Sequence, residues 1–250
     1  MAVSIKSARE IELMREAGKR LAHVHQELEA MIAPGISTWE IDAKGEKLIR
    51  DCGCIPNFLH YNGYPASICV SVNDEVVHGI PRKDRYLKEG DIVSLDAGLI
   101  YKGYHSDAAR THAVGKVSTE AQKLMDVTKQ SFFEGIKMAK EGQHLHDISR
   151  AIEKYVTPYS YGIVRDLVGH GIGTALHEDP QIPNYAQKRR GVRLQAGMTL
   201  AIEPMINAGT WQVRFLRDGW TVVTKDGSLS AHYENTILVT DGEPEILTLY

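Results

Sequence analysis

Residues 91–114 decide the fold, and they read DIVSLDAGLIYKGYHSDAARTHAV. Strand-forming residues lie on both sides of Lys102-Gly103, a pair that is typical of a turn between two strands. The stretch therefore predicts two antiparallel strands, one from Asp91 to Ile100 and one from Tyr104 to Val114.

Each predicted strand carries one aspartate among residues suited to a protein core, Asp96 and Asp107. Ionised carboxylates are costly to bury unless a cation neutralises them. In a hairpin centred near Tyr101-Lys102, the two acids would lie opposite each other on one face, with Cβ atoms ~4.5–5.5 Å apart. That separation suits two acids that share a metal ion.

Three further candidate metal ligands, His170, Glu203 and Glu234, also lie in stretches that otherwise resemble core. A second hairpin, turning at Asp226-Gly227, is expected to supply Glu234, and Glu203 begins the Glu-Pro step that ends its own strand. Two divalent ions would balance the four acids. Oxygen-rich ligation with one imidazole suits manganese, with iron, cobalt and zinc as alternatives. The competing interpretation is that some of these acids only cap turns or pair with arginines.

Capping signatures and helical spacing predict two pairs of helices, with strands after the first pair. The first helix begins at a Ser-x-x-Glu capping box and is stopped by a Pro-Gly pair, and the second begins at another such box. The predicted helices run from Ser7 to before Pro34-Gly35, from Ser37 to about Arg50, over 119–140 and over 147–156, and a further strand covers 67–72.

This order of elements recurs 107 positions along the chain, and the same shift places Asp96 on Glu203. Few identities support the repeat, so chance similarity is the alternative. The repeat and the lack of a linker-like stretch predict one catalytic domain, residues 1–250, with pseudo-symmetric halves of roughly 1–115 and 116–250. The site would lie in the cleft between them.

Composition restricts the class of protein. A hydrophobic content of 43% with 24% charged residues is ordinary for a globular chain, and a net charge of −3 gives no basic field for nucleic acid. The only cysteines, Cys52, Cys54 and Cys69, are too few for a disulfide framework, and Cys52-x-Cys54 would be only half a zinc site. No signal peptide or membrane-length apolar run is present, so we expect a cytoplasmic protein.

The sequence around the candidate ligands is similar to that of a known family. The motifs are NDEVVHGIP at 73–81, GHGIG at 169–173 and IEP at 202–204. With the five ligands in this order, the chain resembles the methionine aminopeptidases of the pita-bread fold over nearly its whole length, and most of all the short bacterial type I form. The resemblance implies an α+β fold in which a pseudo-two-fold antiparallel sheet is flanked by two helix pairs.

The resemblance also implies a role for each ligand. Asp107 and Glu234 would bridge two divalent metal ions, Asp96 would chelate one ion, and His170 with Glu203 would complete the other. The water between the ions would be the nucleophile. Glu203 would take the proton of that water and pass it to the leaving amine.

Two more histidines are implied to act on the substrate. His78 would contact the scissile amide nitrogen, and His177 would donate to the carbonyl oxygen as it becomes an oxyanion. A small apolar pocket would select methionine. By resemblance it is lined by Phe58, Tyr61, Tyr64, Cys69, Leu176 and Trp220. Phe58 and Leu176 depart from what several relatives carry, so the shape of the pocket follows less directly from the family.

The remaining histidines have structural explanations in most cases. His105, two positions before Asp107, is a candidate neighbour of the ligands rather than a ligand. We interpret the others that lie on amphipathic helices or at helix ends as structural: His23, His25, His144 and His146.

The function implied by the family is removal of the initiator methionine from nascent proteins whose second residue is small and uncharged. The expected substrates are N-terminal Met peptides, and the expected state is a monomer without membrane partners. The basic run Lys188-Arg189-Arg190 is either a solvated loop or a contact with ribosomal RNA. The alternatives are a proline-directed peptidase of the same fold, which would normally carry an extra amino-terminal domain, and a non-catalytic binding module.

Overall fold

The hairpin predicted from residues 91–114 lies at the centre of a nine-stranded antiparallel sheet in the computed structural model, which describes residues 3–249. The strand order is β1-β4-β5-β14-β9-β7-β8, with β2 also paired to β4 and β15 to β14. Its strands are β1 (Ile55–Pro56), β2 (Ile68–Val72), β4 (Ile92–Tyr101), β5 (Tyr104–Ala113), β7 (Gly169–Gly171), β8 (Glu178–Ile182), β9 (Thr199–Ile202), β14 (Glu234–Leu238) and β15 (Glu245–Ile246).

Two small three-stranded sheets, ordered β13-β10-β6 and β11-β12-β3, complete the β-structure of the described residues. Their strands are β3 (Glu75–Val77), β6 (Gly162–Ile163), β10 (Met205–Asn207), β11 (Val213–Phe215), β12 (Val222–Thr224) and β13 (Ser230–His232). Two short 3-10 helices, η1 (Tyr61–Gly63) and η2 (Thr157–Tyr159), lie in connections.

Residues 3–249 contain four α-helices: α1 (Ala8–Glu29), α2 (Thr38–Asp51), α3 (Thr119–Ile136) and α4 (Leu145–Val156). Both predicted capping boxes are present, because Ser7 and Ser37 each accept an amide N–H while Glu10 and Glu40 return to the cap residue. Helix α3 ends four residues before the predicted position 140. The reason is that Lys140 leaves the helix to pair with Thr240.

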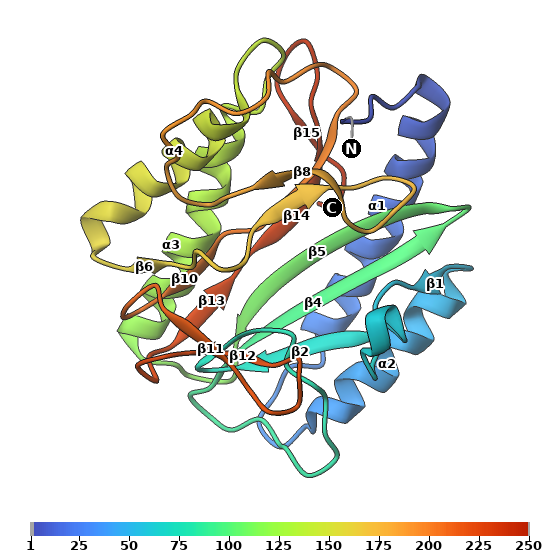
Figure 1. Ribbon diagram of the computed structural model, residues 1–250. Coiled ribbons are helices and arrows are strands. Elements are labelled where there is room, and N and C mark those ends of the chain that lie inside the picture. Colours follow the sequence, from blue (N-terminus) through green and yellow to red (C-terminus); the bar gives the residue numbers. More distant parts are fainter. Residues whose placement is uncertain (1–2, 250) are drawn as a thin grey trace.

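Each helix pair covers its own half of the sheet, as Figure 1 shows with α1 and α2 on one side of the view and α3 and α4 on the other. The first pair packs residues such as Leu21 and Ile49 against Leu95 of β4, and the second packs Phe132 and Ile148 in a separate buried cluster with the second half. The predicted arrangement of an antiparallel sheet with two helix pairs is therefore confirmed.

The central hairpin has a different register from the one predicted. Asp96 pairs with Ala109, and Asp107 pairs with Gly98. The two aspartates therefore share a face of the sheet, as predicted, but are diagonal neighbours, and the prediction of direct pairing was wrong. A Cβ at position 98 would lie 2.6 Å from Nδ2 of Asn57 and 3.1 Å from Oδ1 of Asp107, so the glycine leaves room for both side chains.

The turn explains the shift in register. Tyr101 pairs with Tyr104, so the hairpin is centred between Lys102 and Gly103, one residue later than predicted. Both turn residues have left-handed backbone, with φ of 48° at Lys102 and 84° at Gly103. That combination matches a two-residue type I′ turn, whose geometry fixes the pairing of the flanking strands.

The second predicted hairpin was wrong. The turn at Asp226-Gly227 joins β12 to β13, but β12 pairs with β11 and β3, whereas β13 pairs with β10. Glu234 instead begins β14, which lies between β5 and β9. An Asp-Gly pair between strand-forming residues indicates a turn, but it does not decide which strands pair afterwards.

The 107-residue repeat agrees with the observed bounds at two points. Helices α2 and α4 begin at Thr38 and Leu145, and strands β4 and β9 begin at Ile92 and Thr199, in both cases 107 positions apart. A rotation that superposes the halves stays a prediction, and residues 1, 2 and 250 of the predicted domain lie outside the described range. Among residues 3–249, no helix combines the length and apolar character that crossing a membrane requires.

Candidate metal centre

A cavity of about 260 Å³ opens at the middle of the large sheet. All thirteen residues predicted for the site line it, and Asn62 is the one further lining residue. They are Phe58, Tyr61, Tyr64, Cys69, His78, Asp96, Asp107, His170, Leu176, His177, Glu203, Trp220 and Glu234.

Adjacent strands bring the five predicted ligands to one place. Asp96 lies on β4, Asp107 on β5, His170 on β7 and Glu234 on β14, and Glu203 directly follows β9. No two of them are close neighbours in the sequence, so only the pairing of the strands places them around one cavity.

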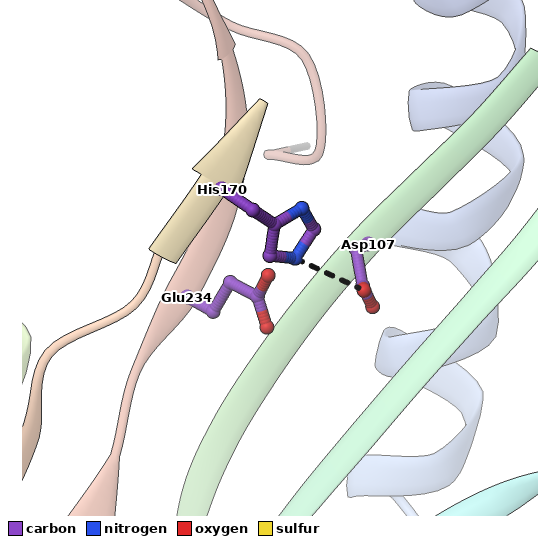
Figure 2. A group of neighbouring side chains, drawn as sticks. All are labelled: Asp107, His170 and Glu234. Atoms are coloured by element: carbon purple, nitrogen blue, oxygen red, sulfur yellow. Dashed lines mark ion pairs between the residues drawn. The ribbon is translucent and has the colours of Figure 1, made fainter. Parts of the chain in front are cut away.

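Three of the five side chains form a tight group, shown in Figure 2. One ligand atom from each of Asp107, His170 and Glu234 lies within 4.8 Å of the others. Nε2 of His170 is 4.0 Å from Oδ2 of Asp107 and 3.6 Å from Oε1 of Glu203. Because metal–ligand bonds are about 2 Å long, ligand atoms of one ion lie roughly 3–4 Å apart, and these separations fit shared coordination.

The carboxylates need a positive partner. Oδ1 of Asp96, Oδ1 of Asp107 and Oε1 of Glu234 are buried and have no hydrogen-bond partner within the described part of the chain. Burial raises the pKa of Asp96 to about 7. Burial, followed by the neighbouring acids, raises the pKa of Asp107 and Glu234 well above their usual range. Unpartnered anionic oxygens facing one cavity are what a site for divalent cations provides.

His170 is oriented toward this cluster. Its Nδ1 lies 2.8 Å from the carbonyl oxygen of Gly171, which leaves Nε2 facing the acids. Burial, followed by His177, lowers the pKa of His170 to about 3, so the imidazole is neutral. A neutral imidazole with one nitrogen bound to a carbonyl is the usual form of a metal-ligating histidine.

His78 and His177 lie at the rim of the cavity. His177 is exposed, and its Nδ1 is 2.8 Å from the hydroxyl of Tyr61. His78 follows β3 with a left-handed φ of 59°, and its ring lies edge-on to Trp220 at 6.3 Å. Burial, followed by His177, lowers the pKa of His78 to about 4, and burial also lowers the pKa of His177. Both rings are therefore neutral near pH 7 and each carries one N–H to donate.

The apolar part of the cavity is built from buried side chains. Tyr64 meets Trp220 edge to face at 5.1 Å, and its hydroxyl donates to the carbonyl of Gly79 at 2.9 Å. Phe58 and Leu176 are buried in the same cluster. Burial, followed by Asp96, raises the pKa of the Cys69 thiol, so Cys69 contributes a neutral, polarizable wall instead of a thiolate ligand.

Two more histidines, His105 and His232, lie two residues before a candidate ligand, and the role of His105 as a neighbour of the ligands stays a prediction. His105 does not line the cavity, and its amide donates to the carbonyl of Gly173. His232 received no role in the sequence analysis, but its Nε2 is 3.7 Å from Oε2 of Glu203 and 3.9 Å from Oε2 of Glu234. Its position two residues before Glu234 was the signal available, because alternate residues of extended chain share a face.

Comparisons with known proteins agree with this geometry. The sequence profile of Metallopeptidase family M24 matches residues 12–241. The chain is similar to the methionine aminopeptidase of Clostridium acetobutylicum, with 53% identity and 99% of each chain covered, and to methionine aminopeptidase 1 of Bacillus subtilis, with 51% identity, 97% of this chain and 98% of that protein covered. The crystal structure of methionine aminopeptidase from Thermotoga maritima matches with a TM-score of 0.97 and 46% identity over 100% of both chains. The expected pita-bread fold is thereby confirmed.

Proposed function

The chain belongs to metallopeptidase family M24, and from this premise we propose that it removes the initiator methionine from proteins whose second residue is small and uncharged. One observation carries the proposal. A single cavity joins a set of five candidate metal ligands to a buried aromatic pocket, with two neutral histidines at its rim. The relatives that the chain matches over almost their full length are methionine aminopeptidases.

The ligand set fits divalent metal ions. We propose that these five residues would hold two divalent ions: Asp107 and Glu234 would serve both ions, Asp96 would serve one, and His170 with Glu203 would serve the other. The unpartnered buried oxygens of Asp96, Asp107 and Glu234 support this assignment. Mostly oxygen ligands with one imidazole suit manganese, iron, cobalt or zinc. When bound, such a pair of ions lowers the pKa of water, so that the water can lose a proton and become a nucleophile at neutral pH. The ions also stabilise the negative charge that develops during the attack.

Side chains of the protein transfer the proton and orient the substrate. Glu203 takes a proton from the attacking water and delivers it to the leaving amine. His177 donates its N–H to the substrate carbonyl oxygen as negative charge grows there, and Tyr61, bonded to its other nitrogen, orients the ring. His78 donates to the scissile amide nitrogen, and its ring lies edge-on to that of Trp220.

Specificity follows from the shape of the cavity. Phe58, Cys69 and Leu176 are buried walls that suit an unbranched, polarizable side chain such as methionine. Beyond the scissile bond, we expect the residues around His78 and His177 to crowd the position of the second residue, so that only a small one fits. A charged side chain would lose its hydration in this pocket without gaining a partner.

Peptide cleavage tests the proposal. Purified protein supplied with Mn²⁺ or Co²⁺ should release methionine from Met-Ala-Ser, Met-Gly-Ser and Met-Ser-Ala peptides. We expect much slower cleavage of Met-Lys-Ser and Met-Phe-Ser, and only a modest loss when norleucine replaces methionine, since one group in an apolar pocket is worth ~1–3 kcal/mol. Comparable turnover of Met-Ala-Ser and Met-Lys-Ser would instead indicate a broader aminopeptidase.

The same assay separates the alternatives. Preferred cleavage of an Xaa-Pro peptide would identify a proline-directed peptidase. Absence of any cleavage with metal bound would favour a binding module. Against that second alternative, all five candidate ligands and both rim histidines are present and line one cavity.

We further propose that residues 1–250 act as one monomeric catalytic domain in the cytoplasm. Contact with the ribosome would bring the site to nascent chains. Lys188, Arg189 and Arg190 are exposed, although Arg190 also pairs with Asp147 at 3.0 Å. Replacing all three with alanine and measuring co-sedimentation with ribosomes tests this contact.

A further inference from the structure

His232 is a buried histidine that the proposed mechanism does not use. Its side chain is 1% exposed at the end of β13. The backbone is held on both sides, because its N–H donates to Oγ1 of Thr111 at 2.9 Å and the same hydroxyl donates to its carbonyl at 2.8 Å. On the other edge it pairs with Met205 of β10. The position of the ring is therefore fixed by β5 and β10 together.

The ring lacks hydrogen bonds of its own. Neither ring nitrogen of His232 has a hydrogen-bond partner within residues 3–249. Buried polar groups that stay unpaired cost about 1–3 kcal/mol, so such a residue usually has a compensating role. Two carboxylate oxygens lie near Nε2: Oε2 of Glu203 at 3.7 Å and Oε2 of Glu234 at 3.9 Å.

His232 does not reach the substrate cavity. It is absent from the wall of the 260 Å³ cavity and lines a second cavity of about 450 Å³, together with His112, Lys129 and Glu29. Its ring thus lies behind the two glutamates, between them and this second cavity. From that place, the ring can act on the reaction through Glu203 or Glu234, whose carboxylate oxygens its Nε2 faces.

The two oxygens of Glu203 face two different histidines. Oε1 is 3.6 Å from Nε2 of His170, and Oε2 is 3.7 Å from Nε2 of His232. His170 is one of the five candidate metal ligands, whereas His232 is not. Carboxylates that bind metals are commonly held by such outer partners, and loss of one typically costs 10–100-fold in affinity or activity.

We propose that His232 is a positioning residue that donates its Nε2–H to Oε2 of Glu203. A small rotation of the carboxylate closes the remaining gap to hydrogen-bond distance. The bond would fix the orientation of the group that transfers the proton, and it would select which oxygen of Glu203 is free to do so. This inference rests on the proposed function of Glu203.

Two substitutions separate a hydrogen-bonding role from simple filling of space. His232→Phe keeps an aromatic ring but removes the donor. His232→Gln keeps a donor near the place of Nε2. His112→Phe is the matched control, because His112 lines the same second cavity and its contact is with Glu29, away from the ligands.

The first measurement is titration of each metal-free protein with Co²⁺ alone, without peptide. We expect His232→Phe to weaken Co²⁺ binding by about 10–100-fold, in line with other outer partners of metal ligands. His232→Gln should recover most of the affinity, and His112→Phe should match the wild type. Thermal unfolding of the metal-free proteins checks that each variant is folded.

The second measurement is turnover of Met-Ala-Ser at saturating metal. We expect His232→Phe to lower kcat while KM stays within about threefold, since the residue does not touch substrate. Wild-type kcat and Co²⁺ affinity in His232→Phe would overturn the proposal, as would a folded His232→Gln that is as impaired as His232→Phe. If the wild type fails to cleave Met-Ala-Ser, the proposed function fails, and the Co²⁺ titrations still decide the role of His232.

Discussion

The two halves of the chain bring their acids to the cavity by different routes. In the first half, Asp96 and Asp107 lie on β4 and β5, which are joined by the two-residue turn Lys102-Gly103. In the second half, Glu203 and Glu234 also lie beside each other, since β9 and β14 are paired. The chain between them, however, forms β10 to β13 in two small separate sheets.

The difference shows what a longer connection adds. A tight turn gives the first half its geometry with local contacts, whereas closing a longer loop costs only modestly more entropy. The longer connection, residues 204–233, also contributes two side chains near the site. Trp220 lines the cavity, and His232 lies near Glu203 and Glu234. The first half thus brings its two candidate ligands together by a local turn, whereas the second half uses a longer connection that also adds these two side chains.

The largest expected effect comes from removing one proposed bridging ligand in each half. Asp107→Ala and Glu234→Ala should each lower kcat/KM for Met-Ala-Ser on the order of 10³-fold, more than the 10–100-fold typical of outer partners. Glu243→Ala, at an exposed acid, is the control. If one of the two ligand variants kept activity within tenfold of the wild type, the halves would not contribute equally.

The rim histidines extend the comparison to the substrate. His78 comes from the first half and His177 from the second. We expect His177→Ala to lower kcat by about 10²–10³-fold, as for loss of an oxyanion donor, and His78→Ala to lower kcat with little change in KM. His23→Ala, at an exposed helical position, should leave both constants unchanged. A rise in KM alone would show that these residues only bind substrate.

The acid cluster should make the metal-free protein sensitive to pH. Burial raises the pKa of Asp96 from an ordinary value near 3.8 to about 7, so the folded state holds a proton that the unfolded state releases. Stability from this group is present below about pH 4 and is lost as pH rises toward 7. Denaturant unfolding in a chelator, from pH 5 to 8, should show this decline. Asp96→Asn should make the decline shallower, with the raised pKa values of the neighbouring acids accounting for what remains, and a profile as steep as that of the wild type would contradict the assignment.

The smallest expected effect concerns the two glycine turns. Gly103 and Gly227 have left-handed φ of 84° and 75°, and a Cβ at either would meet no atom within 4 Å. Gly103→Ala and Gly227→Ala should therefore each cost only the backbone strain, about 1–2 kcal/mol in urea unfolding. Gly242→Ala, where φ is not left-handed, should cost less. A much larger loss at Gly103 would show that alanine there disrupts the pairing of β4 with β5 in addition to straining the turn.

Local sequence determined the helices and the central hairpin, because their signals are short in range. Capping boxes at Ser7 and Ser37 marked helix starts, and the pair Lys102-Gly103 marked the turn. The register of that hairpin was predicted one residue early. It depends on both turn residues adopting left-handed φ, and composition alone did not reveal that Lys102 does so.

Chemical character also let the sequence identify the residues of the site before their positions were known. Acids and a histidine inside core-like stretches indicated a metal centre, and motif resemblance added the rim and the pocket. Only the tertiary structure decided that β14 lies between β5 and β9, and that the turn at Asp226-Gly227 leads into a different sheet. It also decided that His232 lies against Glu203, because pairing between distant strands depends on packing of the whole sheet, which no local pattern encodes.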